Sequence, residues 1–128
     1  MRNTIAALAL TAFALGTAAA ADNPLAPAFG NTLVVKSADG EVTKLRLSED
    51  GTYTGEGPAG DAFTGTWSLK AQNTKFCWKN NEPPKGKPKR PPAGCAPLTP
   101  EVKEEGKPWK QKDFDERQEI TIEIVPGA

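Results

Sequence analysis

The strongest constraint on how this chain can fold is an alternation of apolar and polar residues with a period of two. It is clearest over residues 62–70 (AFTGTWSLK), where Phe63, Trp67 and Leu69 fall on one face of an extended strand and hydroxyl side chains on the other. A helix would scatter these apolar residues around its surface, whereas a half-buried strand gathers them on one face. Gly65, between Phe63 and Trp67, leaves room for a neighbouring aromatic side chain or a close backbone approach.

The same period, interrupted by turn signals, extends over much of the chain. Asp39-Gly40 and Asp50-Gly51 are typical of tight hairpin turns. Strands are predicted at residues 32–36, 42–47, 52–56, 62–70, 75–79 and 118–125. The sequence therefore predicts an all-β fold, an antiparallel up-and-down meander of five to seven short strands. Its last strand could pair with the first and close a small barrel, or it could form the edge of an open sheet.

Residues 1–21 have the layout of a secretory signal peptide. Arg2 is followed by an apolar stretch over residues 5–15 and by small residues that end before Asp22. The apolar run is shorter than the ~20 residues that a membrane-spanning helix needs. We expect cleavage between Ala21 and Asp22 and an exported protein, periplasmic or extracellular. Residues 22–30, with two prolines, are predicted to be an extended N-terminal segment, and residues 31–128 a single small domain that we expect to be a monomer.

The two cysteines, Cys77 and Cys95, are predicted to form a disulfide, because an even count in an exported chain is typical of structural bridges. The bridge matters for stability because the hydrophobic core must be small: Leu, Ile, Val and Phe make up only 18 of the 107 residues from Asp22 onward. The bridge would close a loop of seventeen residues, 78–94. On the chain-entropy estimate, closing a loop of this length stabilises the folded state by about 3 kcal/mol.

A long proline-rich excursion is predicted over residues 80–117. Seven prolines fall within residues 82–100, a stretch for which we predict neither strand nor helix. A basic run extends into this excursion and is opposed only by Glu82; it consists of Lys75, Lys79, Lys85, Lys87, Lys89 and Arg90. This run predicts a contact surface for an anionic envelope component or a partner protein, and the alternative is a solvated loop. The residues assigned to that surface are Lys85, Lys87, Lys89 and Arg90, together with Trp109.

No catalytic group stands out. The chain has no histidine, which removes the commonest acid–base group and the commonest metal ligand. No GxSxG motif surrounds Ser37, Ser48 or Ser68, and acidic pairs such as Glu49-Asp50 fall in turn patterns. We therefore expect no enzyme, no cofactor and no metal site. The 16 basic residues are balanced by 16 acidic ones, which argues against a nucleic-acid binder.

The aromatic residues allow two interpretations. Tyr53, Phe63, Trp67 and Trp78 share the inward face of the predicted strands. They could form the core of a thin domain, or they could line a ligand pocket inside a hollow barrel.

Two short motifs and a cysteine carry a family resemblance. Gly51-Thr52-Tyr53, then Gly65-Thr66-Trp67 and Cys77, resemble the lipocalin-like meanders of small exported bacterial proteins. The chain length and single cysteine pair are also similar to those of secreted bacterial metalloprotease inhibitors, which are small up-and-down barrels. The resemblance implies architecture and no functional residue. We accordingly expect a noncatalytic binding or interaction protein of the cell envelope; the alternatives are a lipocalin-like carrier of a small apolar ligand and a protease-inhibitor-like protein.

Overall fold

A computed structural model describes residues 23–82 and 91–127 of the chain. The predicted signal segment and the four basic residues 85, 87, 89 and 90 lie outside the described residues. The elements are η1 (a 3₁₀ helix, Ala26–Ala28), β1 (Thr32–Lys36), β2 (Val42–Leu47), β3 (Thr52–Glu56), β4 (Ala62–Lys70), β5 (Lys75–Asn80), β6 (Ala93–Pro97), β7 (Trp109–Lys112) and β8 (Glu119–Val125).

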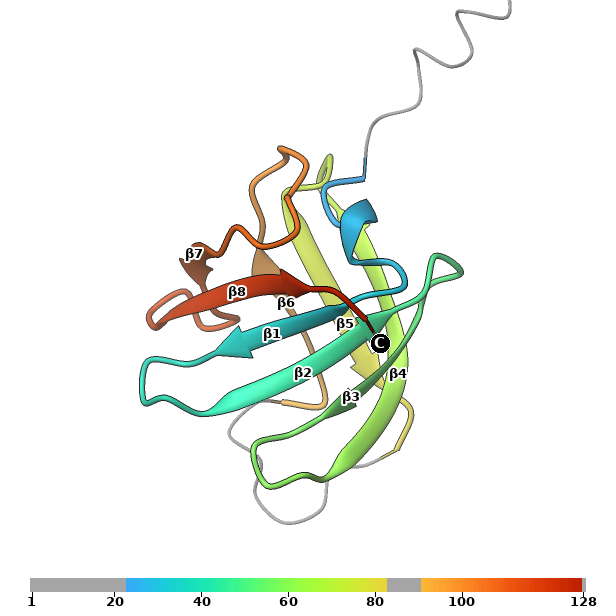
Figure 1. Cartoon of the computed structure of the whole chain (residues 1–128), viewed down its shortest axis with the longest axis vertical. Helices are drawn as coiled ribbons and strands as arrows, with labels where there is room; N and C mark the ends of the chain where they lie inside the picture. Colours follow the sequence, from blue (N-terminus) through green and yellow to red (C-terminus); the bar gives the residue numbers. More distant parts are fainter. Residues whose placement is uncertain (1–22, 83–90, 128) are drawn as a thin grey trace, which may run out of the picture.

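The strands form one antiparallel sheet that curves into a nearly closed barrel (Figure 1). The strand order is β6-β5-β4-β3-β2-β1-β8-β7. The last predicted strand does pair with the first, and the register places Leu33 opposite Ile124. The edges of the sheet are therefore β6 and β7. They approach each other where the side-chain amide of Gln111 donates a hydrogen bond to the carbonyl oxygen of Pro97, at 2.7 Å.

The hairpin turns confirm the turn signals in the sequence. In the turn between β1 and β2, the backbone N–H of Ser37 donates to Glu41, and Gly40 adopts a φ of 91°. The turn between β2 and β3 repeats this pattern with a φ of 93° at Gly51. Glycine adopts such positive φ values without the steric penalty that other residues incur. These turns leave the chain in register for the next antiparallel strand.

Two strands, β6 and β7, were not predicted. The expectation that residues 82–100 contain no strand is wrong for Ala93–Pro97, which pairs with β5. A strand is possible there because β6 is an edge strand whose only proline is its last residue. The N–H of Asn80 donates to Pro92 and that of Leu98 donates to Thr74. By the alternation of an antiparallel ladder, the nitrogen of Pro97 then points away from β5 and needs no partner there.

The N-terminal segment is not extended as predicted. Residues 26–28 form a 3₁₀ turn, and Leu25 and Ala28 are 2% and 0% exposed. The turn lies over one end of the barrel (Figure 1). Residues 98–108, which connect β6 to β7 and are called the strap below, lie at the same end. The backbone N–H of Lys103 in the strap donates to Pro24, so the two segments cover this end together.

The interior is filled by large side chains that lie over glycines of neighbouring strands. Tyr53 on β3 faces Gly65 on β4, and Trp78 on β5 faces Gly94 on β6. A Cβ atom at Gly65 would overlap the Tyr53 ring and the carbonyl oxygen of Lys79. At Gly94 it would lie 3.2 Å from the Trp78 ring. The prediction that Gly65 accommodates an aromatic neighbour is confirmed.

The predicted disulfide is present, and it lies on the outer face of the sheet. Cys77 on β5 is directly opposite Cys95 on β6, with 4.0 Å between their Cα atoms. Its position follows from the alternation that sends Phe76 and Trp78 inward. The bond therefore fixes a short edge strand to the sheet without occupying the interior.

Replacement of Gly65 by Ala should destabilise the protein by about 1–3 kcal/mol, the usual effect of overpacking a core. The added methyl group would overlap Tyr53 and the backbone of β5. Thr66→Ala, at the adjacent outward position, is the matched control and should have a much smaller effect. Urea unfolding of both variants measures the difference, and equal stability of the two would contradict the packing described here.

Candidate functional site

The inside of the barrel is occupied by an aromatic core. Trp67 stacks on Phe76 with ring centroids 6.0 Å apart, and Phe76 stacks on Trp78 at 6.4 Å. Phe29 from the N-terminal segment extends the series at Trp67, and Phe114 extends it at Trp78. Two shallow pockets among the described residues, each of about 230–240 Å³, open on the surface of the sheet. The four inward aromatic residues therefore belong to the hydrophobic core.

Tyr53 lies at the centre of this interior and is 3% exposed. Its hydroxyl donates a hydrogen bond to the side-chain oxygen of Asn80, which faces inward from β5. Burial raises the pKa of Tyr53 to about 12, because the phenolate is poorly solvated there. The hydroxyl is thus a neutral hydrogen-bond donor within the core at neutral pH.

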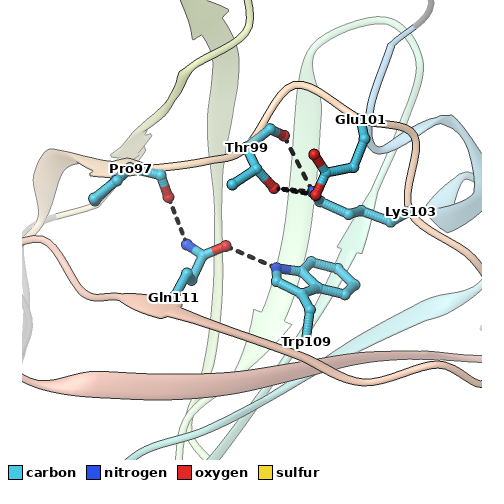
Figure 2. A network of polar contacts seen from close by, with 6 residues as sticks. All are labelled: Pro97, Thr99, Glu101, Lys103, Trp109 and Gln111. Atoms are coloured by element: carbon cyan, nitrogen blue, oxygen red, sulfur yellow. Dashed lines mark hydrogen bonds and ion pairs between the residues drawn. The ribbon is translucent and has the colours of Figure 1, made fainter.

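Trp109, assigned from the sequence to a contact surface, lies in a polar network that closes one end of the barrel (Figure 2). It is partly buried against the core, and its indole N–H donates to Gln111 at 2.8 Å. The ammonium group of Lys103 lies 5.4 Å from the centre of the Trp109 ring. This ammonium also donates to the hydroxyl and the carbonyl oxygen of Thr99 and lies 3.5 Å from Glu101. These contacts hold the strap in place, so we leave Trp109 out of the candidate binding surface.

The most distinctive surface lies on the outer face of β4 and β5. The outward residues of β4 include Thr64, Thr66 and Ser68, and the strand ends at Lys70. Those of β5 are Lys75, Cys77 and Lys79. We call the six polar residues the lysine–hydroxyl face: Thr64, Thr66, Ser68, Lys70, Lys75 and Lys79. Within the described strands β4, β5 and β6, no Asp or Glu is present.

The register places the three lysines at two positions on this face. Lys70 is directly opposite Lys75 at one end, and Lys79 is opposite Thr66 further along the sheet. Like charges directly opposite each other in a sheet are unfavourable. All three lysines are exposed, and no ion pair joins them to an acidic side chain in the described part of the molecule. These lysines give this part of the surface a local excess of positive charge.

A shallow groove follows the same face. Its lining includes Thr66, Ser68 and Lys70 on one strand and Cys77 and Lys79 on the next. Residues 83–90, which carry the four predicted basic contact residues, begin four positions after Lys79. The described lysines are therefore close in sequence to the predicted basic run.

Two exposed acidic side chains, Asp50 and Asp115, accept hydrogen bonds within turns. Hydrogen bonds from Thr52 lower the pKa of Asp50, and those from the Arg117 and Gln118 backbone lower the pKa of Asp115. Both carboxylates are exposed, so they are solvated turn groups of the kind expected from the sequence. Among residues 23–82 and 91–127, no group of three or more His, Cys, Asp or Glu is placed to hold a metal ion.

Comparisons with protein-family models, with curated proteins and with solved structures find no match to this chain. In the described residues, no helix is long and apolar enough to cross a membrane. The candidate site therefore rests on the geometry of the lysine–hydroxyl face.

Sequence reasoning recognised only part of this face. Lys75 and Lys79 belonged to the basic run noted in the sequence, but Lys70 lies on the preceding strand and was not grouped with them. The signal was available in residues 62–70, where the polar positions of the alternation carry three hydroxyls and a lysine. Only the register across β4 and β5 joins the two sets.

Tyr53 provides a pH test of the buried core. Because its folded-state pKa of about 12 exceeds the ordinary value of 10.0, the neutral phenol stabilises the fold fully below pH 10. The free energy of unfolding should then fall by up to about 1.4 kcal/mol per pH unit between pH 10 and 12. Tyr53→Phe should lack this pH-dependent component.

The chain has a single tyrosine, so absorbance at the phenolate band follows Tyr53 alone. A titration midpoint near 10 in the folded protein would contradict the burial of this hydroxyl.

Proposed function

We propose that this chain is a noncatalytic exported protein of the cell envelope that binds an anionic envelope component or an acidic partner through its lysine–hydroxyl face. The observation that carries the proposal is the unneutralised cluster of Lys70, Lys75 and Lys79 on a face whose three strands lack acidic residues. The predicted basic residues of segment 83–90 would add to the same positive potential.

The local distribution of charge supports the proposal, whereas the net charge of the chain does not. The chain as a whole is neutral, with 16 basic and 16 acidic residues, so attraction must come from local separation of charge. Local fields of one sign raise the concentration of oppositely charged partners and speed their encounter. Repulsion between Lys70 and Lys75 adds to this, because an anion held between the two ammonium groups would relieve it.

The fold is suited to such a role because the packing of the core does not depend on the exposed lysine side chains of the outer face. The aromatic core and the strap stabilise the sheet from other sides, and the disulfide stabilises it from the outer face without involving the lysine side chains. Substitutions at the three exposed lysines should therefore leave the stability almost unchanged.

The test is retention of the protein on anionic envelope material at low and high salt. The variant Lys70→Gln, Lys75→Gln, Lys79→Gln should bind about ten-fold more weakly at low salt, given the usual strength of exposed ion pairs. The difference should fade as ionic strength rises beyond about 0.15 M. A second variant with residues 85, 87, 89 and 90 changed to Gln measures the share of the predicted basic run.

The matched control replaces Lys36, Lys44 and Lys110, which are exposed on β1, β2 and β7, by Gln. It changes the net charge by the same amount and should retain most of the binding. If the control and the face variant lose binding equally, the attraction is due to overall charge. If both, and the segment variant, bind like the parent at each salt concentration, the proposed function is wrong.

A further inference from the structure

The lysine–hydroxyl face has two cationic positions separated by hydroxyl groups, and this spacing restricts its ligand. Lys75 and Lys79 are four residues apart on one strand, which corresponds to about 13 Å. Thr66 and Ser68 lie beside this interval on β4, opposite Lys79 and Cys77. The groove thus offers ammonium groups at both ends and hydroxyls along one wall.

We propose that the groove binds a linear anionic saccharide whose charged groups reach both Lys70/Lys75 and Lys79 and whose hydroxyls bond to Thr66 and Ser68. This inference rests on the proposed function and specifies the ligand of that site. A ligand that engages both ends gains from multivalency, because its second contact is intramolecular. The anionic groups can be carboxylates or phosphates, since both accept hydrogen bonds from an ammonium group.

An acidic peptide fits this face less well. Peptides bind commonly by adding to a free sheet edge or by placing apolar side chains in a groove. β4 and β5 are both internal strands, paired on each side, so their backbones have no free edge to offer. The residues that line the groove are polar apart from Cys77 and the inward-facing Trp67 and Trp78. A ligand rich in hydroxyls and charges uses what the groove does offer.

The first experiment measures the affinity of the full mature chain for oligogalacturonides of increasing length, at low salt. The parent should show a marked rise in affinity once the oligomer is long enough to span about 13 Å. Lys79→Gln, and separately Lys70→Gln with Lys75→Gln, should remove this rise and reduce binding of the long oligomers by about five-fold or more. Lys36→Gln with Lys44→Gln should retain it.

The second experiment tests the hydroxyls. Thr66→Val with Ser68→Ala should weaken oligogalacturonide binding by about two- to five-fold, as expected for lost hydrogen bonds to charged or polar groups. Thr52→Val with Thr54→Val, on the neighbouring strand, serves as the matched control.

Other results separate this inference from the proposed function. Affinity could instead rise in simple proportion to the number of carboxylates, with no dependence on the lysines at the two ends of the groove. That result would overturn the proposal of a saccharide bridging the two lysine positions, while the protein would still bind anions. Tighter binding to poly-glutamate, or to vesicles of phosphatidylglycerol in phosphatidylcholine, would likewise replace the saccharide by a peptide or a lipid surface. Failure to bind any of these anionic probes would overturn both proposals.

Discussion

The rest of this structure depends on the packing of large side chains over glycines of neighbouring strands, as in the contact between Tyr53 and Gly65. A chain with few large apolar residues can fill a barrel only if nearly all of them point inward and smaller residues make room for them. Gly65 and Gly94 provide that room beneath Tyr53 and Trp78. Phe29, supplied by the N-terminal segment, completes the core at Trp67. Aromatic side chains consequently pack against one another inside the barrel.

Filling the interior in this way determines what is left for the surface. Alternation along β4 and β5 sends every large apolar side chain inward, so the outward positions are available for hydroxyls and lysines. Cys77 is the exception, since its outward side chain is covered by the bridge to Cys95. The large apolar side chains and the lysines therefore lie on opposite faces of the same strands. That separation explains how a small domain can carry unpaired like charges on one face without losing its core.

Much of the fold could be predicted from the sequence, because period-two alternation and Asp-Gly turns act over a few residues. The strands at 32–36, 42–47, 52–56 and 62–70 agree with β1 to β4 in the structure. The strands β6 and β7 could not be predicted, because their pairing depends on partners distant in the sequence and their own residues lack an apolar alternation. The buried turn at Ala26–Ala28 was not predicted either, because its burial depends on residues distant in the sequence, such as Lys103, whose N–H donates to Pro24. The candidate site could be predicted only in part. The lysines of β5 belong to the basic run in the sequence, but their proximity to Lys70 and to the hydroxyls follows only from the register.

The central claim is that this protein binds anions on the outside of a filled barrel. It is tested most directly by two-dimensional ¹H–¹⁵N NMR of the mature chain during titration with a long oligogalacturonide. The account predicts that shift changes concentrate on residues 64–70 and 75–79, while the indole signal of Trp67, whose N–H donates to Ser48, stays unchanged. Shift changes centred on the interior tryptophans, with the outer face unaffected, would contradict it and indicate a ligand inside the barrel.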